Sequence, residues 1–469
     1  MNTFRNVSAF AFGVTLAFGA LAQNAPAPAQ QQLREIYKEL VEINTTDSAG
    51  SCTAAAEAMA ARLKAGGLPA QDVQVIAPPG GPKKGNLVAR YRGTGAKKPV
   101  MLLGHLDVVE AKREDWQRDP FKLVEENGYF YARGAADDKA MVAVFVANLV
   151  RYRQEGFRPE RDLLLVATCD EEIIPSNFNG IVYLLKNHRN LIDAEFALNE
   201  GGIGRLDKDG RHLFVAIQAG EKVFQTYQLE VTHPGGHSMF PVKDNAITHL
   251  AAGLVRLGAH DFPFKLSATT RAYFERMSRI ESGQTAADMK AILREPPDPA
   301  AIARLSANPG NNSILRTTCV ATMLEAGHAP NALPQRARAT VNCRILPGES
   351  VAEVQGTLER VLADDKIRIA PTHQPTLSPP PPLSREILGP VEAVSAQMFP
   401  GVPVVPTLLA GATDGRFTIN AGIPTYGVSG MSGEPDGSGV HGLNERMRVR
   451  TLYEGHEFLY RLVKLYAGG

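Results

Sequence analysis

The amino-acid sequence predicts an α/β protein in which helices sandwich a mostly parallel sheet and a smaller α+β domain is inserted into the chain. Between residues 87 and 199, short apolar runs alternate with helical stretches, as they do when a parallel sheet is covered on both faces. From about residue 222 to 370, apolar and polar residues alternate instead, which is typical of antiparallel strands with one buried face. The chain has 469 residues, more than one ordinary core accommodates, so we expect two domains.

Residues 33–221, the first part of the larger domain, supply most of the expected sheet. Two helices are expected within residues 33–66, and the second ends at the glycine pair 66–67, a good helix terminator. Such sheets bind their ligands at the carboxyl ends of the strands, so polar residues directly after each strand are the first site candidates. The expected strands are residues 87–91, 100–104, 163–168 and 195–199, and the expected helices between them are residues 138–154 and 179–188.

The inserted domain is expected to span residues 222–370, and residues 371–469 then return to the larger domain. A polar helical stretch at residues 265–310 lies within the insertion and has no assigned place. Prolines 379–382 make a stiff return to the α/β pattern. The strands expected in the insertion are residues 223–232 and 337–345, and the helices are residues 244–258 and 349–363.

The N-terminus resembles an export signal. Arg5 gives a positive start, residues 7–20 are almost free of polar groups, and residues 20–22 form a small-x-small cleavage site. The apolar run is short for a bilayer, so we expect cleavage after Ala22, no stable membrane span afterwards, and a periplasmic or secreted protein. Residues 1–22 are thus a signal peptide, and residues 23–32 are expected to be a disordered spacer.

Charge and cysteine content narrow the function further. The formal net charge is +1 and no Lys/Arg cluster carries interleaved aromatic residues, so we expect no nucleic-acid partner. The four cysteines match no metal-binding spacing. An exported protein could pair Cys319 with Cys343, but Cys169 follows an apolar strand beside acidic residues, and we expect buried free thiols for most of the four.

Five polar residues stand at predicted strand ends or in loops of the larger domain. Each alone has an ordinary explanation as a helix cap, a turn residue or a solvated side chain. Together, two histidines and three carboxylates form a mixed nitrogen and oxygen ligand set suited to zinc. These candidate metal ligands are His105, Asp137, Glu172, Glu200 and His441.

Further acidic residues beside these ligands suggest catalysis. The three consecutive carboxylates at residues 170–172 repel one another, and a metal pair removes that cost. One carboxylate then ligates while its neighbour accepts a proton from water. Asp107 has two alternative roles: it accepts the second ring proton of His105, or it assists catalysis without touching the metal.

A series of motifs in a fixed order spans nearly the whole chain after the signal. They are GHLDVV (104–109), WQRDPF (116–121), ARGAADDK (132–139), DEE (170–172), NEGG (199–202), GGHSMFP (235–241), NALP (331–334), NCRILPG (342–348), ATDGRF (412–417) and HGLNE (441–445). With them the chain resembles the co-catalytic dizinc family of carboxypeptidase G, succinyl-diaminopimelate desuccinylase, acetylornithine deacetylase and aminoacylase. The long insertion resembles the branch with carboxypeptidase S and secreted N-acyl-amino-acid amidases.

The resemblance implies two zinc ions per subunit, for which cobalt or manganese are alternatives that similar ligands bind. It makes Asp137 the bridging ligand, with a cis peptide bond to Asp138, and the other four candidates terminal ligands. It makes Glu171 the general base that activates the attacking water. The inserted domain would be a lid and dimerisation domain, whose His237 stabilises the oxyanion across a homodimer interface.

The resemblance also implies a substrate with a free carboxylate, because Arg344 would bind that group as a planar fork. Asn331 and Arg416 match positions near the lid and the cleft. We therefore expect an exported zinc metallopeptidase of carboxypeptidase or dipeptidase type, acting on a short peptide. The alternatives are an N-acyl-amino-acid amidohydrolase using the same site, and an inactive binding protein, which should lack a ligand or the base. A serine hydrolase is disfavoured because GVSGM at residues 427–431 lacks the final glycine of its motif.

Overall fold

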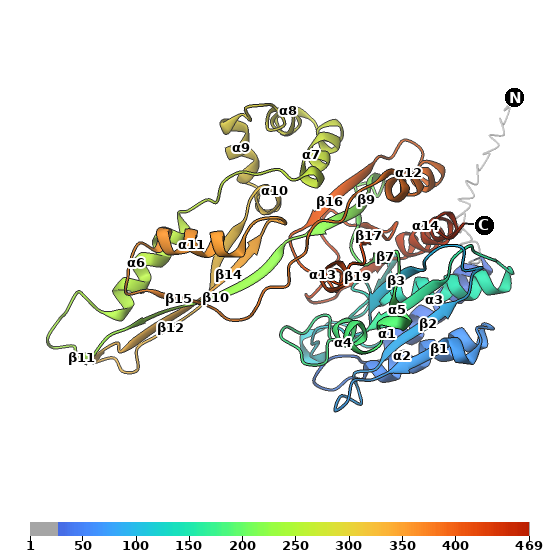
Figure 1. Cartoon of the computed structure of the whole chain (residues 1–469), viewed down its shortest axis with the longest axis horizontal. Coiled ribbons are helices and arrows are strands. Elements are labelled where there is room, and N and C mark those ends of the chain that lie inside the picture. The colour runs from blue at the N-terminus through green and yellow to red at the C-terminus, as the bar shows by residue number, and fades with distance from the viewer. Residues whose placement is uncertain (1–26, 469) are drawn as a thin grey trace, which may run out of the picture.

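A computed structural model describes residues 27–468, so the expected signal peptide, residues 1–22, lies outside the described residues. The molecule has a broad body built on one large sheet and an arm that ends at strand β11 (Gly236–His237) (Figure 1). The arm is the inserted domain, made of a second, four-stranded sheet with helices on it. The two expected architectures are therefore both present.

The large sheet has ten strands, and its centre is parallel. Strand β3 (Val100–His105) lies between β6 and β7 and runs parallel to both. The strand order is β1 (Val73–Ile76), β2 (Asn86–Tyr91), β6 (Leu163–Thr168), β3, β7 (Phe196–Asn199), β17 (Thr425–Gly427), β9 (His212–Glu221), β8 (Gly204–Leu206) and β18 (Ser432–Gly433), and β16 (Val404–Leu409) pairs with β9.

Helices cover both faces of this sheet, which explains the continuous apolar strands. Successive side chains of a strand point to opposite faces, so Leu102 enters one core while Met101 and Leu103 enter the other. The first face is covered by α1 (Pro28–Glu42), α2 (Cys52–Ala65), α3 (Lys139–Gln154), α12 (Arg385–Met398) and α14 (Val449–Ala467). The second is covered by α4 (Gly180–Asn187), α5 (Arg189–Ile192) and α13 (Gly415–Asn420).

Helix α1 begins earlier than the sequence suggests. Residues 23–32 are the expected spacer, yet the helix starts at Pro28, where proline stands at a first-turn position that needs no N–H donor. Leu33 and Tyr37 are fully buried on the same helix face. Packing of that face extends the helix back through a glutamine-rich segment that a local pattern does not distinguish from a linker.

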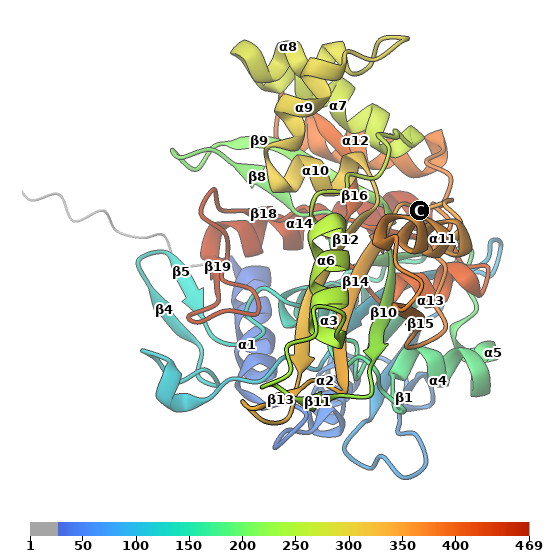
Figure 2. The same cartoon turned by 90° about the vertical axis from the view of Figure 1, so that its left-hand side faces the viewer.

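The small domain comprises residues 223–258 and 318–371. Its sheet has the order β12 (Thr318–Ala326), β14 (Arg336–Ile345), β10 (Val223–Thr232) and β15 (Arg368–Pro371), all antiparallel. Helices α6 (Ala246–Gly258) and α11 (Val351–Leu362) share its apolar core. Strand β10 alternates buried and half-buried residues as predicted, and the short pair β11 and β13 (Ala332–Leu333) forms the tip of the arm (Figure 2).

The stretch at residues 265–310 packs against the large sheet rather than against the small one. It forms α7 (Ala268–Ile280), α8 (Gly283–Ala291) and α9 (Pro299–Ser306), which Figure 2 shows above β9 and β16, and it leads into α10 (Pro309–Leu315). Phe274 and Met277 are buried in one core with Phe214 and Val405. Each helix turns only one face to this core, which is why the sequence reads as polar.

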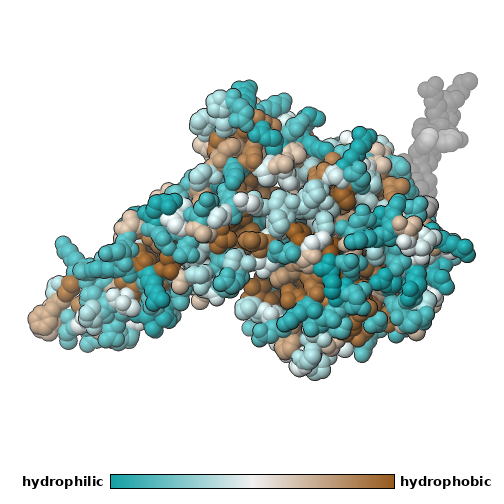
Figure 3. All heavy atoms as spheres, in the orientation of Figure 1, coloured by the Kyte–Doolittle hydropathy of each residue, from teal (hydrophilic) through white to brown (hydrophobic). Residues whose placement is uncertain are grey.

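The remaining strands, β4 (Val124–Glu126), β5 (Tyr129–Tyr131) and β19 (Arg446–Arg448), form a three-stranded sheet, and two short 3-10 turns occupy Ala70–Asp72 and Arg113–Asp115. No helix within residues 27–468 combines the length and the apolar character that a membrane span requires. Hydrophilic residues cover most of the face shown in Figure 3.

The cysteines form two disulfides, so the expectation of buried free thiols is wrong. Cys319 and Cys343 lie opposite each other on β12 and β14. Cys52 and Cys169 are 117 residues apart, and the start of α2 meets the end of β6. An apolar environment accommodates a disulfide as well as a thiol, and the sequence alone does not show this proximity.

Candidate metal centre

The predicted ligands meet because three parallel strands end side by side. His105 is the last residue of β3 and pairs with Thr168, the last residue of β6. Glu172 follows β6 closely, and Glu200 follows β7 directly. The carboxyl ends of the strands therefore deliver these side chains to one edge of the sheet.

Asp137 lies between the two histidines. Its Oδ1 is 3.1 Å from Nε2 of His105, and its Oδ2 is 3.2 Å from Nε2 of His441. Glu172 Oε1 is 2.9 Å from Nε2 of His441, and Glu200 Oε2 is 3.7 Å from Nε2 of His105. All five predicted ligands therefore lie together, and the Asp137 carboxylate contacts both histidines.

The electrostatics of this cluster favour cations. Burial raises the pKa of Glu172 to about 7 and also raises that of Glu200. Burial and the neighbouring Glu200 raise the pKa of Glu171 well above its usual range. Burial opposes charge on His105, yet the carboxylates of Glu200 and Asp137 raise its pKa well above the usual value.

Buried carboxylates are costly unless their charge is compensated. Possible ligand atoms of His105, Asp137 and Glu172 lie within 4.8 Å of one another, and so do those of His105, Glu171 and Glu200. Nitrogen and oxygen donors in overlapping groups, with excess negative charge, fit two divalent cations.

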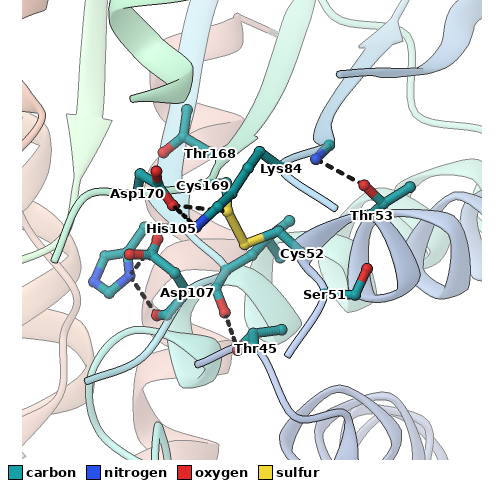
Figure 4. The surroundings of a disulfide bond; sticks show 12 residues. Thr45, Ser51, Cys52, Thr53, Lys84, His105, Asp107, Thr168, Cys169 and Asp170 are labelled. Atoms are coloured by element: carbon teal, nitrogen blue, oxygen red, sulfur yellow. Dashed lines mark hydrogen bonds and ion pairs between the residues drawn. A yellow bond between two sulfur atoms is a disulfide. The ribbon is translucent and has the colours of Figure 1, made fainter. Parts of the chain in front are cut away.

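Asp107 contacts both His105 and the loop that carries Glu171 and Glu172. The Nδ1 atom of His105 contacts the backbone carbonyl of Asp107 at 3.0 Å, whereas the Asp107 carboxylate is 3.7 Å away (Figure 4). That carboxylate instead accepts the backbone N–H groups of Glu171 and Glu172, at 3.2 and 3.0 Å. The carbonyl therefore fixes the imidazole, and the carboxylate holds the loop that carries two acidic residues of the site.

Glu445 is a site residue that the sequence analysis missed. Its carboxylate accepts the backbone N–H groups of Gly134, Ala136 and Asp137, at 2.7–3.1 Å. It also pairs with the buried guanidinium of Arg133 at 2.8 Å. It thereby fixes the loop that presents Asp137. The sequence did contain a signal for this role, because Glu445 is the acid of the HGLNE motif that begins with the proposed ligand His441.

Two further buried acids support the cluster. Asp414 accepts hydrogen bonds from Thr168 Oγ1 at 2.7 Å and from Asn179 Nδ2 at 3.1 Å. Asp138 Oδ2 accepts the backbone N–H of His105 at 3.3 Å. The peptide bond between Asp137 and Asp138 is cis, as the resemblance implied. Burial raises the pKa of both supporting acids.

The predicted substrate-binding arginines lie near each other. Arg344 stacks on Phe224 with its guanidinium carbon 4.7 Å from the ring centre, and Arg416 stacks on Phe417 at 4.6 Å. Burial and the charge of Arg416 lower the pKa of Arg344. Within residues 27–468, neither guanidinium has a hydrogen bond or an ion pair, so both fit an anionic ligand.

His237 and Asn331 lie elsewhere. Both are exposed at the tip of the arm, where Ser238 donates its N–H to the carbonyl of Asn331 at 3.0 Å. Figure 1 shows the tip at the end of the arm, far from β3 and β7. A single chain therefore does not bring these two residues to the ligand cluster.

The GVSGM segment is not a nucleophile elbow. Strand β17 ends at Gly427, and no helix follows it before β18. Ser429 is 1% exposed and accepts the N–H of Met431 at 3.1 Å. Its hydroxyl thus stabilises a loop.

Parallel strand ends that gather histidines and acids around one cleft define a dinuclear metallo-hydrolase. The chain belongs to the peptidase family M20/M25/M40, whose family model matches residues 101–465. This membership confirms the resemblance inferred from the motifs and the hydrolase class.

Two relatives illustrate the range of the family. The mouse N-fatty-acyl-amino acid synthase/hydrolase PM20D1 is 28% identical over 378 residues, covering 78% of this chain and 74% of that protein. The probable carboxypeptidase S-like 2 of Dictyostelium discoideum is 30% identical over 392 residues, covering 81% and 74%.

Solved structures share the fold. An M20 metallo-carboxypeptidase from Sulfolobus solfataricus has a TM-score of 0.68 at 20% identity, covering 93% of this chain and 99% of that one. Human carnosine dipeptidase 1 has a TM-score of 0.65 at 17% identity, covering 94% and 99%. The expected catalytic architecture with an inserted domain is confirmed.

Replacing Glu445 by glutamine is expected to weaken divalent-metal binding about ten- to a hundredfold, the usual effect of losing a partner that orients a metal ligand. In the variant, the amide N–H₂ would face backbone N–H groups that donate to a carboxylate oxygen in the wild-type protein. Competition with a chromophoric chelator measures the affinity. Glu457→Gln is the control, because Glu457 pairs with Arg151 and Arg461 instead. Equal affinities in all three proteins would show that Glu445 does not position Asp137.

Proposed function

We propose that the chain is an exported dizinc metallopeptidase of carboxypeptidase or dipeptidase type that hydrolyses an amide bond next to a free carboxylate. The main observation that supports this proposal is the position of Asp137 between His105 and His441. Glu171 and Asp137 line the same cavity. Zinc ions at His105, Asp137, Glu172, Glu200 and His441 would polarise the scissile carbonyl and lower the pKa of a water molecule. Cobalt or manganese would suit similar ligands.

Glu171 is proposed as the general base. Its backbone N–H is held by Asp107, and one of its carboxylate oxygens lies within 4.8 Å of ligand atoms of His105 and Glu200. From this place it accepts a proton from the attacking water and returns it to the leaving amine nitrogen. Asp107 acts through the loop it holds.

Two cavities support a proposal for how the two ends of the substrate are oriented in the site. One, of about 370 Å³, is lined by Glu171, Glu172 and Thr413, and the other, of about 540 Å³, is lined by the residues that follow in the same loops, including Arg416. We place the amino acid that bears the free carboxylate beside Arg416 and Arg344. The other part of the substrate then occupies the cavity on the ligand side.

The lining of the cavity on the ligand side favours a second candidate, an N-acyl-amino-acid amidohydrolase. Beyond the proposed ligands its wall is mainly apolar, which suits an acyl chain better than a polar peptide. Relatives named as N-fatty-acyl-amino acid hydrolases agree with this candidate. The apolar wall consists of Met141, Ile203, Leu409, Met431, Val440 and Met447.

Glu171→Gln is expected to reduce kcat by about 10²–10⁴-fold while zinc remains bound, because the amide cannot accept the proton. Hydrolysis of dipeptides and N-acyl amino acids, followed by mass spectrometry of the released amino acids, gives the rates. Metal analysis of the same samples gives zinc content. A wild-type protein that binds zinc but cleaves none of these substrates would favour an inactive binding protein. Unchanged activity of the variant would reject Glu171 as the base.

Acyl-chain length separates the two candidate functions. If the apolar cavity binds an acyl chain, N-dodecanoyl-phenylalanine should have a higher kcat/KM than N-acetyl-phenylalanine. Ile203→Asp should lower the first value by about tenfold or more, since burying one apolar side chain contributes about 1.5–3 kcal/mol. The same variant should leave kcat/KM for the N-acetyl substrate unchanged. If dipeptides have a higher kcat/KM than both acyl substrates, the result would favour the dipeptidase.

Arg344→Met tests recognition of the carboxylate. A hydrogen bond to a charged group contributes about 1.5–3 kcal/mol, so kcat/KM for substrates with a free carboxylate should fall about ten- to a hundredfold. The same substrates with a carboxamide end provide the control, and their kcat/KM should not change. A parallel loss with both substrate series would mean that Arg344 acts on the fold rather than on the carboxylate.

We also propose a homodimer through the small domain. Strand β12 lies at the edge of its sheet and exposes apolar residues, with Val320 at 61%, Met323 at 69% and Leu324 at 66%. Unpaired edges of this kind promote association. Dimerisation would give the exposed His237 of one copy a route to the cleft of a second copy, where it would stabilise the oxyanion.

Sedimentation velocity of the zinc-loaded protein should therefore give the mass of a dimer. Leu324→Glu should shift the protein to monomer and remove activity, because a charge would face the partner strand. Leu465→Glu, on α14 and 50% exposed, is the matched control and should remain dimeric and active. An active monomeric wild-type protein would contradict both the dimer and the role of His237.

Export is supported by the two disulfides, since such bonds persist in oxidising compartments. The proposal combines them with the signal-like N-terminus. N-terminal sequencing of the mature protein should start after Ala22, in the periplasm or the medium. Recovery from the cytoplasm with Met1 retained would contradict export.

A further inference from the structure

We propose that the Cys52–Cys169 disulfide is a positioning element of the hydrolytic site, which holds the loop of Glu171 and Glu172 in its metal-binding geometry. The proposal rests on the proposed function for its catalytic readout only. Cys169 stands one residue beyond the end of β6 and two residues before Glu171. Its bonded partner, Cys52, is the first residue of α2.

The disulfide lies against the residue that organises this loop. Sulfur atoms of Cys52 and Cys169 and a carboxylate oxygen of Asp107 lie within 4.8 Å of one another. The Asp107 carboxylate accepts the N–H groups of Glu171 and Glu172, and its carbonyl contacts the ring of His105 (Figure 4). Any shift of the disulfide is therefore transmitted through Asp107 to a proposed ligand on each side.

Helix α2 gives the disulfide a fixed base. Ser51 caps the helix by accepting the N–H of Ala54 at 3.2 Å. Ala55, Met59 and Leu63 are fully buried in the main core. The loop beyond β6 has no regular structure of its own between Cys169 and Asn179. The covalent bond thus connects an irregular loop to a rigid helix.

Non-covalent contacts hold the other side of the loop. Lys84 Nζ pairs with Asp170 Oδ1 at 2.7 Å, and Ser176 Oγ donates to Asp170 Oδ2 at 2.6 Å. Asn86 Oδ1 accepts the N–H of Cys169 at 2.9 Å. These contacts hold the Asp170 side chain and the backbone of Cys169. Without the disulfide, no covalent bond would join the loop to α2, and its placement against Asp107 would depend on the hydrogen bonds from Glu171 and Glu172.

The second disulfide provides a matched control within the same chain. Cys319 and Cys343 join neighbouring strands of the small domain that already pair along most of their length. They contact none of the five proposed ligands. Removing this bond changes the covalent constraint on the unfolded chain without touching the proposed metal ligands. Because Cys343 precedes Arg344, this control is compared by zinc affinity.

The experiment compares Cys52→Ser/Cys169→Ser with Cys319→Ser/Cys343→Ser. Both variants are purified from an exporting host, and thermal unfolding confirms that they are folded at the assay temperature. Zinc affinity is measured with a competing chelator, and kcat and KM are measured at saturating zinc. We expect the first variant to lose about tenfold or more in zinc affinity, the size of effect of losing an orienting partner. Its kcat should fall while KM changes little, and the second variant should match wild type in zinc affinity.

A folded Cys52→Ser/Cys169→Ser protein with wild-type zinc affinity and kcat would overturn the proposal and leave the bond a stabilising cross-link only. If serine at these buried positions prevents folding, Cys52→Ala/Cys169→Val fills the space with apolar groups and is judged by the same readouts. If wild-type protein binds zinc but hydrolyses none of the substrates, the proposed function fails. The positioning role is then decided by zinc affinity alone.

Discussion

The concentration of buried carboxylates at one edge of the large sheet is the constraint around which the molecule is organised. Asp137, Glu171, Glu172 and Glu200 lie beside two histidines, and burial raises the pKa of the three glutamates because it disfavours their charged form. Divalent cations relieve this cost, and parallel strands supply the geometry because their carboxyl ends coincide. A sheet covered on both faces therefore carries its most polar residues only where the helices leave it open.

Holding such a cluster requires support from outside it. Glu445 fixes the loop of Asp137, and Asp107 fixes the loop of Glu171 and Glu172. Asp414 binds the end of β6 from a distant part of the chain. These supports come from segments on both sides of the inserted domain. The insertion therefore separates in sequence two segments that act together in space.

Much of this was predictable from local patterns. The positions of His105 and Glu200 at strand ends follow from apolar runs that stop abruptly, and β10 follows from its alternating residues. The start of α1, the place of residues 265–310 and the Cys52–Cys169 disulfide were not predictable in this way. Each depends on contacts between distant segments, and local periodicity reports only which side of an element is buried.

The sequence by itself determined the fold class and the family and indicated the candidate ligands, because strand periodicity and motif order are properties of neighbouring residues. Only the tertiary structure decided that Asp137 faces both histidines, that the carbonyl of Asp107 orients His105, and that Glu445 supports the site. It also decided that His237 lies at the exposed tip of the arm in a single chain. Those facts are distances between segments far apart in the sequence, and packing of the two sheets and their helices sets them.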